Sequence, residues 1–549
     1  MMSELVQLKL NIETSVTIVS SGEYRRSRTS QKELSAAKSE STPTEAETGG
    51  PLPLVEVGVS RLDQGIMIQE MIREEERLVR RMAQDVLAGQ RLGNYPLYFN
   101  FPLHIQFDLT ARCNLRCLHC FNDSPAENPQ AESMTDDRWR TLAGQIIGEG
   151  GVFEACFSGG EPLLKKDLLL EMLGLFAEDG ASLMVITNGN LLDEKTVVAL
   201  QKFTRLKVRL SIDGHNAELH DGLRQVPGSF HKAVKAARLM ALHGVAFEIS
   251  SCVTPASLAS MERMAELTHE LGAGNILFDM LIQSGRAAKN KHLMLDLAQA
   301  EDFYTRLKTL RHKQAFVSPA YTGTIPIQSA LSGLPQTSLL IRPNGDVRLG
   351  CLAPFVIGSV LTEEIGEIWR RKGIGAWEDP RVREYLRNTD VVSGANKGLV
   401  NYLDQDVRLD FSSLTKKEEG QQDLPPKYTP PSVIPYPGFG GYENNKQDLS
   451  LLSLSAKGTA LKAREDGYYL LARSAREILV LNWTARLVYR QLDGTRTIGE
   501  IAQELAAGLE TEAETVKADL TGFCRKLTDF GLIKLLPTKV TCAPAFSRN

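Results

Sequence analysis

The chain of 549 residues is 42% hydrophobic and 24% charged, an ordinary balance for a globular protein with room for two or three domains. Its 63 Lys and Arg against 67 Asp and Glu leave a formal net charge of −4, which gives no reason to expect a nucleic acid or an anionic membrane as a partner. No run approaches the roughly 18 apolar residues of a membrane span, and no signal peptide is visible, so we expect a cytoplasmic protein.

The first hundred residues offer little material for a core. Residues 5–19 could form a strand or two, and the stretch 20–52 is rich in Ser, Thr, Glu and Lys, so 1–60 is predicted to be a disordered or weakly ordered tail. A charge-dense amphipathic helix is expected within 61–100. Neither segment has a predicted role.

Strands and helices alternate from residue 101 to about residue 320. Six strand candidates occur there, at 103–110, 152–158, 182–187, 206–212, 245–253 and 275–282. Repeated strand–helix units imply a parallel sheet with right-handed crossovers. We therefore expect an α/β fold, a partial (β/α)6 TIM-like barrel whose site gathers at the C-terminal strand ends.

The alternation stops after this region. Residues 338–351 predict a hairpin with an Asn-Gly turn, within an extension at 321–400. Six prolines between residues 425 and 437 indicate a semi-rigid linker at 401–450.

The last domain is expected at 451–540. A strand pair, three helices and a closing strand predict a winged helix-turn-helix. Thr497 and Glu500 have the spacing of a capping box at the start of the second helix.

Three of the eight cysteines stand together just after the first expected strand. Cys113, Cys117 and Cys120 have the spacing C-x3-C-x2-C. Three thiolates can hold three irons of a 4Fe-4S cube and leave the fourth open to a ligand such as S-adenosylmethionine (SAM). The alternative is a closed zinc site, because His119 lies inside the triad and three Cys with one His form a tetrahedral centre.

The triad, the alternation and the strand-end motifs together resemble the radical SAM superfamily over roughly residues 100–320. FSGGEPLL at 157–164 is similar to the glycine-rich motif of that family. The resemblance implies that Gly159 and Gly160 bind the methionyl amine through their backbone, with the negative charge of Glu161 nearby. It also implies that His119, at a position that is usually aromatic, packs near the SAM adenine.

Two further strand-end motifs, ITNGN and SIDG, fit the same resemblance. It implies that Ser211 and Arg224 contact the SAM carboxylate and that Asn188 and Asp213 line the ribose side. SGRA at 284–287 is also similar to the family. Each motif has a structural alternative, because Asn-Gly and Asp-Gly are common turns and an exposed arginine is usually solvated.

Residues 341–369 resemble the start of the SPASM/twitch-like extension that carries auxiliary clusters in peptide-modifying relatives. Only Cys351 remains here, and a single thiolate cannot hold a cluster, so we expect one 4Fe-4S cluster and SAM as the cofactors. Cys351 is either a small buried hydrophobe or a catalytic hydrogen-atom donor to a substrate radical.

The string LNWTARLVYRQLDGTRTIGEIAQEL resembles the PqqD-like peptide chaperone of pyrroloquinoline quinone biosynthesis, a recognition element of enzymes that modify ribosomally made peptides. The resemblance implies that a leader peptide adds as a strand to the sheet edge beside the third helix. DNA binding is the alternative, but helix 511–530 carries four acids against three bases and lacks a phosphate-binding face.

These observations predict a radical SAM enzyme that modifies a ribosomally synthesised precursor peptide, with the leader held by the C-terminal domain. A 5′-deoxyadenosyl radical would abstract hydrogen, leading to epimerisation, splicing or cross-linking, and flavodoxin or ferredoxin would supply the electron. Two alternatives stay open. One is a radical SAM enzyme acting on a small molecule or folded protein, and the other is an iron–sulfur redox sensor that binds DNA.

Overall fold

The computed structural model describes the main body over residues 98–124, 132–281, 284–314, 316–319, 334–351, 353–388 and 406–411. The described residues elsewhere are 16–20, 77, 83–84, 330, 453–455, 460–463, 469–474, 477–481, 488–489, 492, 496–509, 512–529 and 534–536. Most of the predicted tail, N-terminal helix and proline-rich linker therefore lies outside the described residues.

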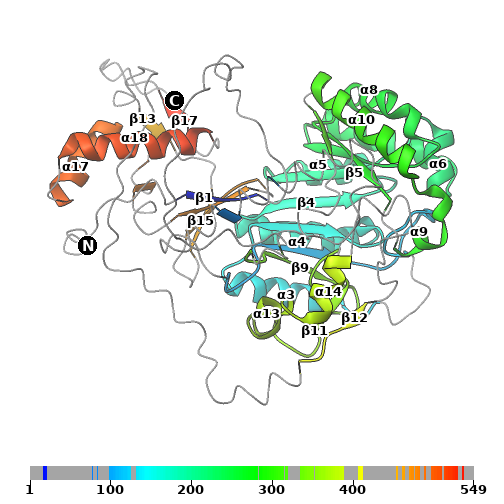
Figure 1. The fold of residues 1–549 in the computed structure, drawn as a ribbon, viewed down its shortest axis with the longest axis horizontal. Helices are drawn as coiled ribbons and strands as arrows, with labels where there is room; N and C mark the ends of the chain where they lie inside the picture. Colours follow the sequence, from blue (N-terminus) through cyan, green and yellow to red (C-terminus); the bar gives the residue numbers. More distant parts are fainter. Residues whose placement is uncertain are drawn as a thin grey trace, which may run out of the picture.

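An eleven-stranded sheet, seen in Figure 1, runs through the main body in the order β12-β11-β10-β9-β2-β3-β4-β5-β6-β7-β8. Seven of these strands are parallel and follow one another in chain order: β2 His104–Asp108, β3 Glu154–Ser158, β4 Ser182–Thr187, β5 Leu206–Ser211, β6 Phe247–Val253, β7 Ile276–Met280 and β8 Val317–Pro319. The first six confirm the predicted strands. β8 was not predicted, because three residues that end in a proline show no period.

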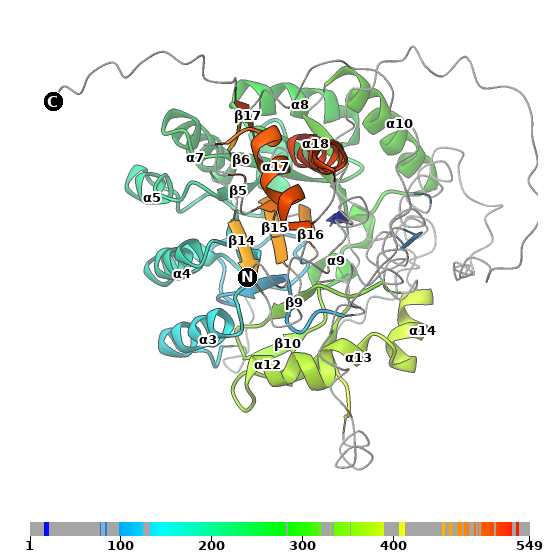
Figure 2. The same ribbon diagram turned by 90° about the vertical axis from the view of Figure 1, so that its left-hand side faces the viewer.

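Helices connect the parallel strands and form an arc along one face of the sheet in Figure 2. The longer ones are α3 Asp136–Gly148, α4 Lys166–Glu178, α5 Glu194–Leu200, α6 Ala217–Arg224, α7 Ser229–Leu242, α8 Met261–Glu270 and α10 Leu297–Lys313. Side-chain caps set where several of them begin. Asp193 caps α5, Asn216 caps α6, and Asp296 with Gln299 forms a capping box on α10.

The main core lies between the sheet and these helices. The ring of Phe107 stacks on Phe157 at 5.2 Å and meets the edge of Trp139 at 6.2 Å, measured between ring centroids. Burying each such side chain stabilises the fold by about 2 kcal/mol. Because successive strand residues face opposite ways, the neighbours Gln106 and Asp108 face the concave side, where the site lies.

The extension continues the sheet beyond β2. β9 Ser338–Ile341 pairs parallel with β2, and β10 Asp346–Arg348 and β11 Phe355–Ser359 follow antiparallel. The predicted Asn-Gly turn is confirmed, since Gly345 has φ +84° between β9 and β10. The segment ends in α12 Ile365–Ile368, a π-helical stretch Trp369–Gly373, α13 Ile374–Ala376 and α14 Pro380–Asn388.

The chain meets this sheet once more in a segment that was predicted to be linker. β12 Val407–Arg408 pairs parallel with β11, and Asp406 just before it forms an ion pair with Arg348 at 3.3 Å. The remainder of the predicted linker lies outside the described residues.

The C-terminal segment forms a smaller sheet in the order β1-β16-β15-β14. Its strands are β14 Ala460–Ala463, β15 Tyr469–Ser474, β16 Glu477–Leu481 and, from the other end of the chain, β1 Val16–Ser20. α17 Ile498–Leu509 and α18 Ala513–Asp529 follow, and β17 Lys534–Leu536 pairs with β13 Ser453–Ser455.

One local prediction for this segment is confirmed. The amide of Thr497 donates to the Glu500 carboxylate at 2.7 Å, and the amide of Glu500 donates to the Thr497 hydroxyl at 3.2 Å, which is the capping box. Leu520, Phe523 and Leu527 on α18 are fully buried. The first of the three predicted helices lies mostly outside the described residues, so the winged helix-turn-helix stays a prediction.

None of the helices in the described ranges combines the length and the apolar character that crossing a membrane requires.

Candidate functional site

The three cysteines of the triad lie on the loop that leaves the C-terminal end of β2. A backbone amide donates to the sulfur of Cys113 at 3.4 Å, and another donates to the sulfur of Cys120 at 3.2 Å. The guanidinium of Arg224 lies 3.7 Å from the sulfur of Cys117. Each sulfur therefore receives a donor that favours its thiolate, the form that binds iron.

The environment of these thiols fits a metal cluster. Burial raises the pKa of Cys113 to about 11 and also raises that of Cys117, and a bound cation would favour the loss of these two protons. No three His, Cys, Asp or Glu side chains in the described ranges are placed to hold one common metal ion.

α6 braces the triad loop from the side. The loop amides of residues 116 and 118 donate to the last carbonyls of α6, at 3.3 and 2.9 Å. This contact brings Arg224, the final residue of α6, against both Cys117 and Asp213, whose carboxylate accepts from its Nε. The arginine thus joins the strand end after β5 to the cysteine loop.

Asp213 is the buried centre of this group, with 2% of its surface exposed. Its Oδ1 accepts from the amide of Cys252 at 3.0 Å, and its Oδ2 lies 3.5 Å from Nε2 of His119. Burial opposes ionisation, but the charge of Arg224 outweighs it and holds the pKa of Asp213 well below its usual range. The site therefore contains a permanent carboxylate paired with a permanent guanidinium.

His119 faces this carboxylate as a neutral ring. Burial lowers its pKa to about 4, against the opposing effect of Asp213, and its Nδ1 is buried without a hydrogen-bond partner. A neutral ring with one unused polar atom matches the aromatic role that the resemblance implies for this position better than a cationic one.

Asn188 and Glu161 connect neighbouring strand ends. The side-chain amide of Asn188, just after β4, donates to Asn114 in the cysteine loop at 2.8 Å. Glu161 is fully buried, and its oxygens accept from the amide of Asn188 at 2.9 Å and from the hydroxyl of Thr187 at 2.7 Å. Glu161 therefore holds Asn188 in place, a role that the sequence did not reveal.

Gly159 and Gly160 bring the end of β3 against the start of the cysteine loop. Gly159 has φ +130°, and the amide of Gly160 donates to the carbonyl of Thr110 at 2.7 Å. A Cβ on Gly160 would lie 2.1 Å from the carbonyl oxygen of Arg112. Both residues must be glycine for this close approach of two backbones, whatever ligand they bind.

Ser211 ends β5 and is half-buried at the C-terminal edge of the sheet. Within the described residues its side chain forms no hydrogen bond or ion pair with the site residues named above, so its predicted role depends on a ligand.

A short helix, α9 Arg286–Lys289, holds the other side of the cysteine loop. Nε of Arg286 donates to the carbonyl of Cys117 at 2.8 Å, and its Nη1 forms an ion pair with Asp123 at 3.0 Å. Gly285, with φ +56°, lies so close that a Cβ there would be 2.5 Å from the carbonyl of Cys120. The SGRA motif is thus a support of the loop.

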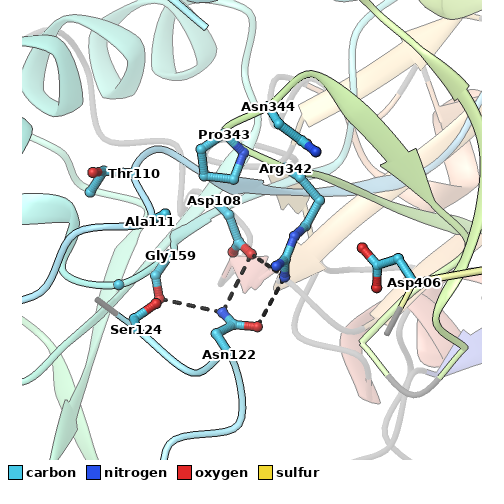
Figure 3. A pocket seen from close by; sticks show the side chains of 11 residues that line it. Asp108, Thr110, Ala111, Asn122, Ser124, Gly159, Arg342, Pro343, Asn344 and Asp406 are labelled. Carbon is cyan, nitrogen blue, oxygen red and sulfur yellow. Dashed lines mark hydrogen bonds and ion pairs between the residues drawn. The ribbon is translucent and has the colours of Figure 1, made fainter. Parts of the chain in front are cut away.

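An open hollow lies beside the paired glycines (Figure 3). Asp108, Asn122 and Arg342 converge on it from β2, the cysteine loop and the extension. Nη1 of Arg342 lies 3.0 Å from Oδ1 of Asn122 and 3.5 Å from the buried carboxylate of Asp108. This polar wall can bind a substrate that supplies amide or charged groups.

Cys351 belongs to the same hydrogen-bond network as Asp108. Its thiol donates to Oε1 of Gln106 at 3.3 Å, and Nε2 of Gln106 donates to Asp108 at 3.1 Å. Burial, with the charge of Asp108 added, raises the pKa of Cys351 to about 11. Cys351 is half-buried and is not among the residues that line the hollow, and the hydrogen-bond chain from it reaches the lining residue Asp108 through Gln106.

Sequence reasoning missed Asp108, Asn122 and Arg342. Asp108 stands at the end of β2, and Arg342 directly follows β9, which pairs with β2 up to Phe107 and Ile341. Charged residues at strand ends were the available signal for two of them. The pairing of β9 with β2 was not predicted, and it alone brings Arg342 to Asp108.

Two family models match the chain. Residues 108–267 match the radical SAM superfamily, and residues 467–533 match the coenzyme PQQ synthesis protein D, PqqD.

Three relatives illustrate the range of similar proteins. The antilisterial bacteriocin subtilosin biosynthesis protein AlbA of Bacillus subtilis is 26% identical over 280 residues, covering 49% of this chain and 60% of AlbA. The AdoMet-dependent heme synthase of Methanosarcina barkeri is 32% identical over 34% of this chain and 53% of its own length. The PqqA peptide cyclase of Rhodopseudomonas palustris is 28% identical over 51% of this chain and 77% of its own length. The chain thus spans between about half and three fifths of the first two relatives.

Proposed function

Because the chain carries a radical SAM domain and a PqqD domain, we propose that it is an enzyme that modifies a ribosomally synthesised precursor peptide. The observation that carries this proposal is the union of the two domains in one chain. Two of the relatives, a bacteriocin biosynthesis protein and a peptide cyclase, have names that fit such a role.

The cofactors would occupy the C-terminal ends of β2 to β5. Cys113, Cys117 and Cys120 would hold one 4Fe-4S cluster, and the strand ends beside them would hold SAM. Together these groups supply an electron and a 5′-deoxyadenosyl radical that removes hydrogen from a substrate. The protein would orient them and keep water from the radical.

Individual residues would divide this task. Gly159 and Gly160 would present backbone groups to the methionyl amine, and His119 would offer its neutral ring to the adenine. Ser211 and Arg224 would hold the carboxylate. Arg224 uses Nε and Nη1 for Asp213 and Cys117, so it would reach SAM through Nη2.

Asn188 and Asp213 would line the ribose side, since both lie beside the cysteine loop. Glu161 would act through Asn188, whose backbone it holds. This makes Glu161 a positioning residue in our proposal.

The peptide would be held at two places. The C-terminal domain would bind the leader, and the core would reach the hollow lined by Asp108, Asn122 and Arg342. Tethering raises the concentration of the core at the barrel without demanding tight contacts there. A small reductase such as flavodoxin or ferredoxin would supply the electron.

The experiment uses anaerobically reconstituted full chain and a synthetic precursor encoded beside its gene, incubated in deuterated water. We expect a change in peptide mass that requires SAM, together with about four irons per chain. Replacing Cys113, Cys117 and Cys120 by Ala together should remove both iron and product. Zinc in place of iron, or product formed without SAM, would contradict the proposal.

A radical SAM enzyme for a small molecule is the second candidate, favoured by the 32% identity with a heme synthase. The two candidates differ in what they require of the C-terminal domain. Peptide modification should depend on that domain, whereas turnover of a small molecule should survive its removal.

A further inference from the structure

The small C-terminal sheet contains a strand from the opposite end of the chain. β1 pairs antiparallel with β16 along its whole length, in the register Val16↔Leu481, Thr17↔Val480, Ile18↔Leu479, Val19↔Ile478 and Ser20↔Glu477. β15 pairs with the other side of β16. Without β1, β16 would be the edge of this sheet.

An exposed strand edge is a binding surface for extended peptide. It presents a row of backbone N–H and C=O groups that any strand of suitable register can pair with. β1 reads VTIVS, in which four of five residues are β-branched and none is charged, a composition that favours the extended form. Its register on β16 is unbroken, whereas β15 meets β16 with a shift between Ala472 and Ser474.

We propose that β1 is a built-in occupant of the edge of β16, and that a leader peptide must displace it to bind there. The identity of the competitor, a leader peptide, rests on the proposed function. The occupancy of the edge by β1 does not depend on it. A competitor of matching chemistry is an uncharged, β-branched stretch of about five residues that runs antiparallel to β16.

The consequence is that β1 weakens the binding of any peptide that competes for the edge of β16. β1 belongs to the same molecule as β16, so its pairing does not weaken on dilution. A peptide from solution binds only the fraction of molecules whose edge is open, and its apparent Kd rises by the inverse of that fraction. If the edge is open in about one molecule in ten, binding weakens about tenfold.

The test uses a probe taken from the chain itself, a fluorescent synthetic peptide of residues 11–25. The full chain is compared with a variant in which residues 16–20 are replaced by Ser-Gly-Ser-Gly-Ser. We expect the variant to bind the probe about tenfold more tightly. Backbone amides of residues 477–481 should exchange hydrogen faster in the variant, and excess probe should restore their protection. The same replacement at residues 36–40 is the matched control and should behave as the unchanged chain.

Single prolines give a sharper test of strand pairing. In an antiparallel pair, the N–H groups of alternate residues point at the partner, and proline is tolerated where the N–H points away. Thr17→Pro and Val19→Pro should therefore behave alike, and Ile18→Pro should differ from them. One parity should tighten probe binding as the replacement does, and the other should leave it nearly unchanged. Equal effects at all three positions would overturn the pairing.

The outcomes separate this inference from the proposed function. Equal probe affinity and equal exchange in the unchanged chain and the variant would overturn the occupancy by β1. Tighter probe binding by the variant, with no modification of any precursor, would leave the occupancy standing and would contradict the proposed function alone.

Discussion

At the scale of single residues, a missing Cβ decides the shape of the site. Gly160 lies against backbone, and a Cβ would stand 2.1 Å from the carbonyl oxygen of Arg112. Backbone atoms cannot make room by a change of rotamer, as a flexible side chain can. The loop that bears the cysteines would therefore have to move. The same contact explains why a Gly-Gly pair follows β3.

We expect Gly160→Ala to lower the free energy of unfolding by about 1–3 kcal/mol and to reduce the iron bound after reconstitution. Denaturant unfolding of the iron-free chain and iron analysis measure the two effects. Gly144→Ala on α3 is the control, since its Cβ meets nothing within 4 Å. It should be neutral or stabilising by up to about 1 kcal/mol, and equal losses in both variants would contradict the backbone contact.

His119 gives a prediction for pH. Burial lowers its folded pKa to about 4, below the usual 6.5, so the unfolded chain binds a proton that the folded chain refuses. The contribution of His119 to the free energy of unfolding is therefore fully present above pH 6.5. It is lost as the pH drops toward 4, a decrease on the order of 3 kcal/mol.

His119→Phe should remove that part of the pH dependence while keeping an aromatic ring at the position. Unfolding by denaturant at several pH values between 4 and 7 measures the slope. An unchanged slope would show that the imidazole titrates alike in the folded and unfolded chain.

Cys351 is the catalytic prediction at this scale. Its raised pKa keeps the thiol protonated at neutral pH, and only an intact S–H bond can give hydrogen to a carbon radical. If the reaction is epimerisation, Cys351→Ala should still form 5′-deoxyadenosine but no D-residue product.

Mass spectrometry and chiral amino-acid analysis measure these two products. In the unchanged enzyme, solvent deuterium should enter the peptide at one α-carbon. Cys156→Ala is the control, because it removes a different thiol, which is buried on strand β3 beside β2. Normal epimerisation by the Cys351 variant would assign Cys351 to packing.

At the scale of elements, α9 acts on the cysteine loop through backbone contacts. Arg286 donates to the carbonyls of Cys117 and Ser124 and pairs with Asp123. Arg286 thus joins three points of the loop. We therefore assign Arg286 to positioning the cysteines.

Arg286→Ala should shorten the lifetime of bound iron about tenfold, because each lost hydrogen bond contributes about 0.5–1.5 kcal/mol. The rate of iron transfer to a chelator and the electron paramagnetic resonance spectrum of the reduced cluster measure the effect. Lys289→Ala, which removes only an exposed pair with Asp123, is the control. Equal rates in the two variants would contradict the positioning role.

At the scale of the whole molecule, our proposal divides recognition and chemistry between two domains. The buried core of the barrel is continuous from β2 to the extension, and the site lies at the C-terminal ends of its strands. The leader would be held by a domain with a separate sheet. Losing that domain should therefore spare the chemistry.

Deleting residues 451–549 should leave SAM cleavage in place but reduce peptide modification about a hundredfold at peptide concentrations well below saturation. Saturating peptide should recover most of the rate, because tethering only raises local concentration. Product rates by mass spectrometry, with 5′-deoxyadenosine as the internal control, measure both. A full rate at low peptide concentration would show that this domain is not the recognition element.

Local patterns in the sequence predicted a large part of the fold. The six strands from β2 to β7, the Asn344-Gly345 turn and the capping box of Thr497 with Glu500 all follow from residues close in the chain. Each depends on the side-chain period of a strand, on a residue that tolerates positive φ or on a helix cap. Residues close in the chain determine all three. The position of the cysteine triad at a strand end likewise followed from the sequence, because the triad comes directly after the first predicted strand.

Tertiary structure alone decided three features of the site and its partner domain. Arg342 meets Asp108 across 234 positions because β9 pairs with β2, and Glu161 accepts a hydrogen bond from the backbone amide of Asn188. β1 finds β16 from the far end of the chain. Sequence by itself determined where the strands β2 to β7 lie, and it predicted residues that we propose carry the chemistry. The choice of partner strand depends on backbone edges that every strand presents alike, so only the folded molecule decides it.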